Sequence, residues 1–451
     1  MRLHAGNEKG FVKIFFSILI AVVALFIIWQ WTGDLPAIQL AQEIKGIGRS
    51  TPVTILSSDA RGLRAVLVEI EQGGLKVPIL EETYGARWDF WRNGPKNINR
   101  EVVLGPSKQT QLKDGDATLR ITAWNKNWFS SRSEFSQTFP VRTRPPSIEV
   151  RSGLLYINQG GSEIVTYKVS ATAVSSGVQV GTYFFRGYQL PGGQAGDRMA
   201  LFAFPPDLPT TTTAVIVAQD EIGNEARASF SYQLLKKNFR HREITVDDAY
   251  FQATVPAILA ETPALQDQGE LLKNFLLVNG TLRRENRQKI KEMSKQTAPS
   301  FLWEGPFMQL GNTAVEAQFA DFRSYIYQGK KVDEQVHLGF DLASFQHAPV
   351  IASNAGEVVL AEYLGIFGNS IILDHGLGLQ SLYSHLSAIE VKPGDKVTKG
   401  QEIGKTGTTG LAGGDHLHFS MLVGGVEVNP VEWWDPLWVQ QHILARLNEA
   451  K

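Results

Sequence analysis

Apolar and polar residues alternate at every second position through much of the first half of the chain. Clear examples are 65–70, 117–124 and 164–169. This period of two is typical of half-buried strands, and short strands between turn residues predict antiparallel β-sandwiches. We therefore expect a mainly β protein with two tandem immunoglobulin-like modules, 34–145 and 146–236, that act as spacers or bind partners.

The pattern changes to steps of three and four residues in 237–300, which predicts a helical segment. The expected helices run over 247–259, 267–278 and 282–293, and Asn279-Gly280 should separate the last two. The third helix carries a run of basic residues, which we interpret as a solvated face.

Residues 301–434 return to strand patterns interrupted by frequent glycine. The runs 358–360, 370–374 and 380–384 are expected to be strands of one domain. A final helix, 435–451, should begin with Asp435 as its N-cap and proline at the next position. We expect it to pack four apolar side chains against the domain: Leu437, Trp438, Leu444 and Leu447.

An uncharged, mostly apolar run covers 14–31, with Arg2, Lys9 and Lys13 before it. As a helix these 18 residues would span about 27 Å, near the lower limit for crossing a bilayer. We predict a transmembrane anchor within 1–33, whose basic residues keep the amino terminus in the cytoplasm. A cleaved signal peptide is the alternative, but no small-x-small cleavage site follows Trp31.

Composition sets limits on the chemistry. The chain has 451 residues, a net charge of −1 and no cysteine. It thus has no disulfide, no thiol nucleophile and no cysteine-ligated metal, and its charge gives no reason to expect a nucleic-acid partner. Any zinc site must use imidazole and carboxylate groups.

Candidate chemistry is concentrated near the end of the chain. His416 and His418 are two residues apart in a predicted strand, so both side chains should point to the same face. His337, Asp341 and His385 lie upstream. A catalytic zinc takes three protein ligands and leaves one position for water, so His337, Asp341 and one of the two paired histidines satisfy that number. His385 and the remaining histidine would then be free for proton transfer.

The stretch from about Phe319 to Pro430 resembles the lysostaphin-type (LytM-like) zinc metallopeptidases that cut peptidoglycan cross-links. The motifs that carry the resemblance are His337-Leu-Gly-Phe-Asp341, Tyr383-Ser-His385-Leu386, Val391-Lys-Pro-Gly394-Asp-Lys-Val397, Lys399-Gly400-Gln401, Gly407-Thr-Thr409-Gly410, His416-Leu-His418-Phe419 and Val428-Asn429-Pro430. The resemblance implies a twisted antiparallel sheet with the paired histidines on a central strand, and a groove walled by loops.

Specific roles follow from the resemblance. It assigns one Zn²⁺ per chain to His337, Asp341 and His418, and makes His385 and His416 the catalytic pair. A tyrosine, Tyr325 or Tyr327, would assist near the oxyanion. Two positions depart from the family pattern: Gly413 replaces a frequent threonine, and Ser420 replaces a frequent acidic residue.

The expected function is hydrolysis of peptide cross-links in peptidoglycan by a membrane-anchored zinc endopeptidase. The catalytic domain would lie in the periplasm or cell-wall space, outside the cytoplasmic (inner) membrane, with peptidoglycan stems as substrate and envelope proteins as possible partners of the β-modules. A non-catalytic scaffold or activator of other wall hydrolases is the main alternative. A biotinyl or lipoyl carrier is disfavoured, because the glycine-rich stretch 391–404 has no lysine at a hairpin tip.

Overall fold

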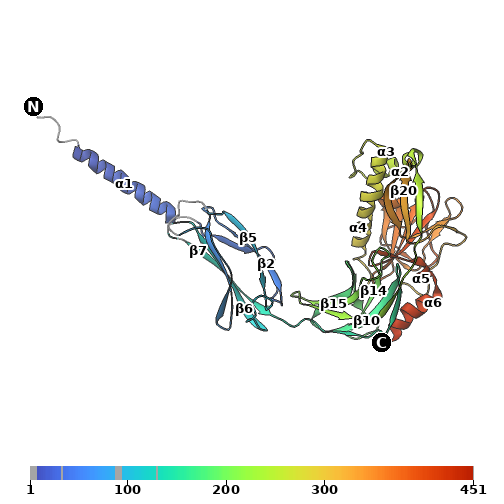
Figure 1. The fold of residues 1–451 in the computed structure, drawn as a ribbon, viewed down its shortest axis with the longest axis horizontal. Coiled ribbons are helices and arrows are strands. Elements are labelled where there is room, and N and C mark those ends of the chain that lie inside the picture. The colour runs from blue at the N-terminus through green and yellow to red at the C-terminus, as the bar shows by residue number, and fades with distance from the viewer. Residues whose placement is uncertain (1–7, 32–33, 87–93, 128, 130, 450–451) are drawn as a thin grey trace, which may run out of the picture. The chain divides into compact units, whose positions relative to one another are not determined.

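A computed structural model describes residues 8–31, 34–86, 94–127, 129 and 131–449 (Figure 1). The chain divides into two compact units. The first consists of Met1–Pro145 with Gln219–Glu225, and the second of Pro146–Ala218 with Ala226–Lys451. Both are built mainly of strands, which confirms the predicted fold class.

Helix α1, Glu8–Trp31, contains the predicted apolar run. Its stretch Phe11–Trp29 is long and apolar enough to cross a membrane, and none of its residues is buried against protein. Apolar side chains on every face of a helix are typical of a helix surrounded by lipid or by other apolar groups. An anchor and a signal sequence both have these properties.

Two antiparallel sheets make up the rest of the first unit. The strands are β1 (Ala37–Leu40), β2 (Thr51–Ser58), β3 (Leu63–Gln72), β4 (Leu75–Thr83), β5 (Asn97–Leu104), β6 (Gly115–Asn125) and β7 (Arg132–Val141). Their orders are β1-β2-β5 and β4-β3-β6-β7. Val53 and Ile55 from one sheet share a hydrophobic core with Val68 and Leu119 from the other, as the period of two requires. Whether this module is immunoglobulin-like stays a prediction.

The second unit begins with a second β region. Its strands are β8 (Ile148–Val150), β9 (Leu155–Asn158), β10 (Ser162–Val169), β11 (Ala173–Val180), β12 (Tyr183–Arg186), β13 (Tyr188–Gln189), β14 (Asp197–Ala203), β15 (Ala214–Asp220), β16 (Glu225–Ser229) and β17 (Tyr232–Leu235). They form sheets of order β13-β14-β10-β8 and β12-β11-β15-β16, and β17 pairs with β9. The boundaries predicted for this module remain untested.

The predicted helical segment opens with a strand, β18 (His241–Val246). Helices α2 (Asp248–Ala260), α3 (Leu271–Leu276) and α4 (Arg283–Met293) follow. The predicted break at Asn279-Gly280 is wrong, because a π-helical turn, η1 (Leu277–Leu282), joins α3 to α4 without interruption. The buried Asn279 amide donates to Asp333 Oδ2 at 2.8 Å, and such a tertiary bond can stabilise a wider turn where local propensity favours a break.

The remaining strands form a sheet domain. They are β19 (Ala314–Ala317), β20 (Asp321–Tyr327), β21 (Lys330–His337), β22 (Phe340–Ala343), β23 (Pro349–Ile351), β24 (Gly356–Tyr363), β25 (Asn369–Asp374), β26 (Leu379–Leu386), β27 (Ala388–Ile389), β28 (Lys396–Val397), β29 (Glu402–Lys405), β30 (Leu417–Val423) and β31 (Val426–Val428), with a 3₁₀ turn η2 (Gly365–Phe367). The main sheet has the order β19-β22-β30-β26-β25-β24-β28, with β31 beside β30. Two three-stranded sheets, β18-β20-β21 and β23-β29-β27, accompany it.

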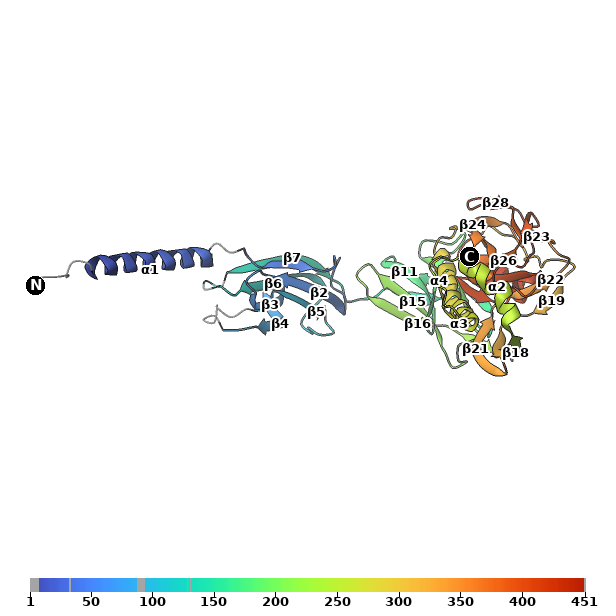
Figure 2. The ribbon, with the colours of Figure 1, turned by 90° about the horizontal axis from the view of Figure 1, so that it is seen from above.

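Helices α2 to α4 cover one face of the main sheet (Figure 2). Phe251 of α2 and Ile290 of α4 belong to the same hydrophobic cluster as Leu382 and Leu422 of the central strands. Since successive side chains of a strand alternate between faces, His418 and Ser420 lie on this helix-covered face together with Leu422.

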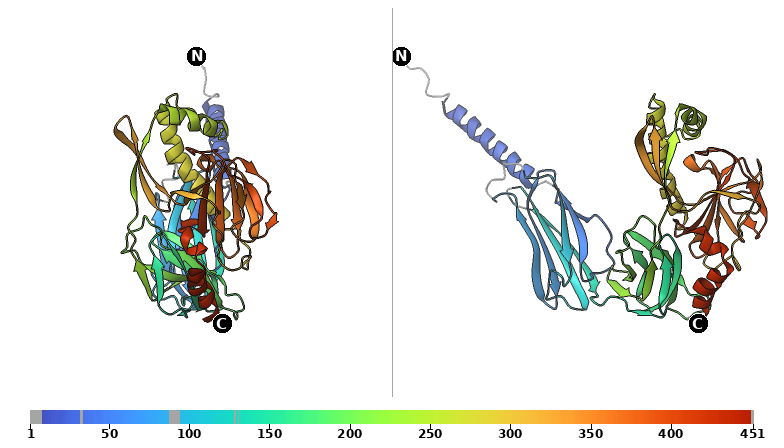
Figure 3. Two further views of the ribbon diagram at one scale, coloured as in Figure 1. Left: turned by 90° about the vertical axis from the view of Figure 1, so that its right-hand side faces the viewer. Right: turned by 45° about the vertical axis from the view of Figure 1, so that its right-hand side comes forward.

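The chain ends in short helices beside the second β region: α5 (Pro430–Trp434), α6 (Pro436–Trp438), η3 (Val439–Leu444) and α7 (Ala445–Glu449) (Figure 3). Asp435 caps α6 through a 2.8 Å bond from Leu437 N, as predicted. Trp438 and Leu447 are buried and Leu444 is partly buried, but Leu437 is 62% exposed. The prediction that Leu437 packs was wrong, because as the second residue of α6 it points away from the face that packs.

Candidate metal centre

Asp341 and His418 face each other across two antiparallel strands. Asp341 of β22 is the register partner of His418 of β30. β30 lies between β22 and β26 and is central in the main sheet, as expected. His337 is the last residue of β21, and the turn between β21 and β22 folds its side chain back toward the same carboxylate. Three strands thus meet at one polar cluster.

The ligand atoms of these residues are close together. His337 Nε2 and His418 Nδ1 lie 3.0 Å apart, and each is 2.9 Å from Asp341 Oδ1. His337 and His418 are buried. Among the residues that the structure describes, these three form the group suited to hold a metal ion.

Hydrogen bonds fix which nitrogen of His337 is available. Its Nδ1 lies 3.0 Å from the carbonyl oxygen of Gln318. A carbonyl only accepts, so Nδ1 carries the proton and donates it. The lone pair of the neutral ring is therefore on Nε2, which faces Asp341. Partners of this kind orient metal-binding histidines in many proteins.

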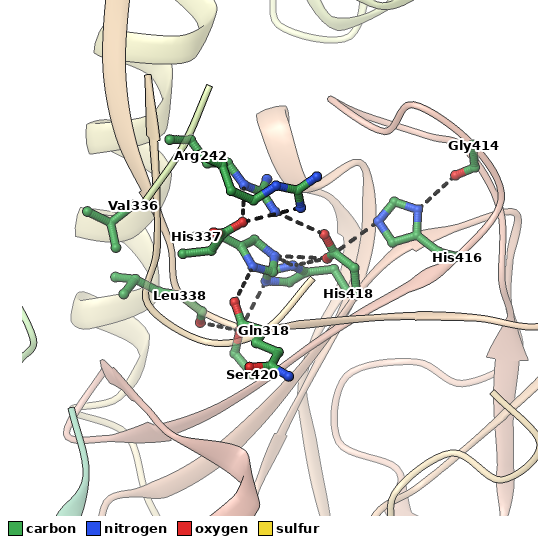
Figure 4. A network of polar contacts seen from close by, with 12 residues as sticks. Arg242, Gln318, Val336, His337, Leu338, Gly414, His416, His418 and Ser420 are labelled. Atoms are coloured by element: carbon green, nitrogen blue, oxygen red, sulfur yellow. Dashed lines mark hydrogen bonds and ion pairs between the residues drawn. The ribbon is translucent and has the colours of Figure 1, made fainter. Parts of the chain in front are cut away.

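The hydroxyl of Ser420 determines in the same way which nitrogen of His418 is available (Figure 4). Its hydroxyl donates its single proton to the carbonyl of Leu338 at 2.8 Å. The hydroxyl oxygen must then accept from His418 Nε2, 3.1 Å away, and the His418 lone pair is left on Nδ1. The ring needs this space: a Cβ on Gly339 would lie 2.6 Å from His418 Nε2 and from Ser420 Oγ.

The donor set fits zinc. Two neutral imidazoles and one carboxylate are the kind of ligand set found at catalytic zinc sites that leave one position open. Ligands about 2.0–2.1 Å from a tetrahedral ion lie about 3.3 Å from each other, close to the separations of 2.9 and 3.0 Å found here. Both lone pairs already point into the gap.

His385 and His416 lie next to this group. The His385 ring centroid is 4.8 Å from that of His416 and 5.8 Å from that of His418. His385 Nδ1 donates to the carbonyl of Thr409 at 2.8 Å, and His416 Nδ1 donates to that of Gly414 at 2.7 Å. In its neutral form each ring therefore has its lone pair on Nε2, and Nε2 of His416 lies 3.5 Å from Asp341 Oδ1. The predicted catalytic pair and the predicted ligands are brought together.

His385 also has an unusual backbone. Its φ is +65°, in the left-handed region that side chains other than glycine rarely adopt. Backbone strain of this kind is concentrated at functional sites. Burial, followed by the nearby rings of His416 and His418, holds the pKa of His385 well below its usual range. In His416 burial lowers the pKa, but the Asp341 carboxylate outweighs it and the net direction is upward.

The group opens into a cavity of about 300 Å³. Two loops form walls, as the resemblance implies: Ile366 and Phe367 come from one, and Leu411 and Gly413 from the other. A third wall was not predicted: it comes from 244–247 and Tyr250, where β18 pairs in parallel with β20. Sequence gave no signal for this pairing, because it depends on long-range register.

The two candidate tyrosines, Tyr325 and Tyr327, lie in different surroundings. Tyr325 is buried and lines the cavity. Tyr327 donates its hydroxyl proton to Asp248 Oδ1 at 2.7 Å and does not line it. Residues at i and i+2 of a strand share a face, so the direction of the side chains does not distinguish the two tyrosines. The surroundings of each side chain do, and they favour Tyr325.

Sequence reasoning missed Arg323, which contacts the site carboxylate directly. Its guanidinium lies 3.4 Å from Asp341 Oδ2 and 3.3 Å from Asp321 Oδ2. Arg242 approaches the buried Asp321 at 3.6 Å (Figure 4). Arg323 therefore occupies the oxygen of Asp341 that faces away from the histidines, which leaves Oδ1 for a metal.

His375 and His347 lie outside this cluster. His375 is buried, donates from Nδ1 to the Ala355 carbonyl at 2.7 Å and contacts Ser381 Oγ at 2.7 Å. His347 contacts Ser387 Oγ at 3.0 Å. Neither lines the cavity.

Comparison with known proteins identifies the sheet domain. Residues 335–430 match the family model of peptidase family M23, a family that depends on zinc in general. The matched range contains His337, Asp341, His385, His416 and His418, and the resemblance noted in the sequence is confirmed.

Individual relatives match over the same part of the chain. The DD-carboxypeptidase/endopeptidase Mpg of Neisseria meningitidis is 39% identical over 97 residues, 22% of this chain and 22% of Mpg. The peptidoglycan DD-endopeptidase ShyA of Vibrio cholerae is 41% identical over 96 residues, 21% of this chain and 22% of ShyA. The catalytic domain of lysostaphin from Staphylococcus simulans is 30% identical, covering 29% of this chain and 98% of that domain, with a TM-score of 0.26. The chain thus spans about a fifth of the length of these curated relatives.

Proposed function

Because residues 335–430 form a domain of peptidase family M23, we propose that the chain is a zinc-dependent endopeptidase that hydrolyses peptide cross-links in peptidoglycan. One observation carries the proposal. The lone pairs of His337 and His418 converge on Asp341 Oδ1, and two further histidines, His385 and His416, lie beside them. A purely structural metal site would have no need of that second pair.

We assign zinc to His337 Nε2, His418 Nδ1 and Asp341. When bound, zinc supplies a Lewis acid that polarises the substrate carbonyl and lowers the pKa of a water molecule to about 7. His385 and His416 accept and return protons through Nε2, because their Nδ1 protons are held by the carbonyls of Thr409 and Gly414.

The cavity adds positioning to this chemistry. Tyr325 lines it and is the tyrosine assigned to assist near the oxyanion. Phe367 lies against the metal ligands, with its ring centroid 5.7 Å from that of His418. An extended peptide suits a cavity walled by loops better than a folded protein does.

The predicted layout supports a substrate in the cell envelope. Of the relatives named above, ShyA is by name a peptidoglycan DD-endopeptidase and Mpg a DD-carboxypeptidase/endopeptidase. The apolar helix α1 is assigned as an inner-membrane anchor. The predicted β-modules, 34–145 and 146–236, would carry the sheet domain into the periplasm, and a DD cross-link between stems is the expected target.

The test is digestion of isolated sacculi by the zinc-loaded full chain in detergent. Loss of cross-linked muropeptide dimers with a matching gain of monomers, and with glycan strands intact, is the expected result. Unchanged dimers in a protein shown to contain zinc would contradict the proposal and favour the scaffold or activator function.

A further inference from the structure

Arg283, the first residue of α4, lines the same cavity as the metal group. Its guanidinium makes its hydrogen bonds to one neutral residue, Asn279: Nε donates to the carbonyl at 3.0 Å, and a terminal nitrogen donates to the side-chain oxygen. Asn279 is itself held by Asp333 Oδ2 at 2.8 Å. The guanidinium is thus fixed in position without being neutralised.

No carboxylate forms an ion pair with Arg283 in the part of the chain that the structure describes. Arg323, the other cation of the cavity, differs because it contacts both Asp321 and Asp341. Burial lowers the pKa of Arg283 to about 10, so the side chain remains a cation at neutral pH. Arg283 is partly buried, and a cation partly withdrawn from water without a charged partner is unfavourable. This imbalance points to an anion that arrives from outside the chain.

The surroundings of Arg283 suit such an anion. Tyr250 and Tyr325 line the same cavity, and burial raises the pKa of Tyr250 to about 12, which keeps its hydroxyl protonated and able to donate. The acidic residues of the cavity are Asp341, which is committed to the metal group, and Asp247, which caps α2 by accepting from Tyr250 N at 2.8 Å. The acidic residues of the cavity are therefore engaged elsewhere, and the cation Arg283 is left to bind a negatively charged group.

We propose that the Arg283 end of the cavity is a subsite for a carboxylate of the peptide substrate. A guanidinium is well matched to a carboxylate in charge and in fork geometry. The proposal rests on the proposed function, whose substrate carries carboxylates at the stem terminus and on its diamino-acid or glutamate side chains. Arg283 lies outside residues 335–430, so this subsite is a contribution of the helical segment and not of the family domain.

Binding of a small probe tests the subsite without turnover. The probes are N-acetyl-D-alanine and N-acetyl-D-alaninamide, titrated by NMR into the full chain in detergent, both zinc-loaded and chelator-treated. The acid should bind at least about 10-fold more tightly than the amide in both forms, and Arg283→Gln should remove the difference. The chelator-treated form matters because zinc can also bind a carboxylate.

Arg284→Gln is the matched control. Arg284 is the next residue of the same helix, is exposed, and does not line the site cavity. It should preserve the preference for the acid, and zinc content should be unchanged in both variants. Equal binding of acid and amide by the wild-type protein overturns the proposal, even if Arg283→Gln fails to fold. Acid binding that requires zinc and ignores Arg283 overturns it equally.

Hydrolysis then identifies the source of the carboxylate. Muropeptide dimers are compared with dimers amidated either at the stem terminus or on the side-chain carboxylates. Amidation of the recognised group should lower kcat/KM about 10- to 100-fold in wild type and have no effect in Arg283→Gln. Probe binding through Arg283 without any cleavage by the wild type would retain the subsite and reject the proposed function. Cleavage that is unaffected by either amidation, in a protein that binds the acid and the amide equally, would retain the proposed function and reject the subsite.

Discussion

His418 Nδ1 lies 2.9 Å from Asp341 Oδ1, although 77 residues separate the two in the chain. They are direct partners across β22 and β30. In an antiparallel pair, opposed side chains on one face lie within about 4.5–5.5 Å at Cβ. The sheet register alone therefore brings two of the three predicted ligands into contact, and no loop has to close for the site to form.

The first prediction concerns metal content. The full chain should bind one zinc, and His418→Ala should lose it, since the two remaining protein ligands are too few for a stable catalytic site. His337→Ala should behave the same way. Zinc per chain is measured by elemental analysis after dialysis, with His347→Ala as the control outside the cavity. Full occupancy in both ligand variants would contradict the assignment.

The second prediction separates ligand from catalyst. His385→Ala should keep its zinc, because His385 donates from Nδ1 to the carbonyl of Thr409 and is not one of the three residues whose ligand atoms converge. Turnover of muropeptide dimers should fall by about 10²–10⁴-fold, the usual effect of removing a general acid or base. Zinc and activity lost in equal proportion would show that His385 is a ligand.

Sequence patterns predicted the site residues because strand alternation places His416 and His418 on one face while Leu417 and Phe419 enter the core, where both are 2% exposed. They did not predict the wall made by β18, since its parallel pairing with β20 depends on register between segments about 80 residues apart. Nor did they reveal Arg283 at the cavity. The expected break at Asn279-Gly280 would have separated that arginine from α3, whereas the π-turn continues the helix.

The third prediction concerns pH and Glu432. This buried side chain accepts from Asn158 Nδ2 and Ser162 N, each at 2.9 Å, and burial raises its pKa to about 7. Glu163 faces it and raises the pKa further, whereas His442, which contacts Glu163 at 2.7 Å, lowers it.

A carboxyl group whose pKa is raised in the folded state stabilises the fold. This contribution is fully present at pH values below the unfolded-state pKa of 4.5 and is lost as the pH rises through about 7. The loss is on the order of 3 kcal/mol. The Tm of the wild type should therefore fall more between pH 5 and pH 8 than that of Glu432→Gln. Burial lowers the pKa of His375 to about 4, so this residue makes the protein more stable as the pH rises toward 6.5. Both proteins contain His375, and the comparison therefore uses only the difference between their Tm values. Glu449→Gln, an exposed change, should follow wild type. Parallel curves for Glu432→Gln and wild type would refute the assignment.

The fourth prediction concerns membrane topology. If α1 is an uncleaved anchor, a reporter fused after Lys451 should be active only outside the cytoplasm, and the mature protein should retain its first 30 residues. Intact mass of the membrane fraction measures the second point. A soluble major species that begins near residue 35 would favour a signal peptide.

The last prediction concerns Ser420, one of the two positions that depart from the family pattern. Its hydroxyl donates to Leu338 and accepts from His418 Nε2, so it holds the ring in the tautomer whose Nδ1 can bind metal. Ser420→Ala removes that acceptor and should weaken zinc binding by about 10–100-fold, the usual effect of losing such a support. Competition with a chelator measures the affinity directly, independent of activity.

Ser381→Ala is the matched control for that experiment. Ser381 contacts Nε2 of His375 at 2.7 Å, so it too supports a buried histidine, but one that lies away from the cavity. Its loss should lower Tm while leaving zinc affinity unchanged. Ser420→Thr retains the hydroxyl and should recover most of the affinity if its extra methyl group is accommodated beside Gly339. An affinity in Ser420→Ala equal to that of wild type would mean that Asp341 and the ring packing of Phe367 orient His418 without help.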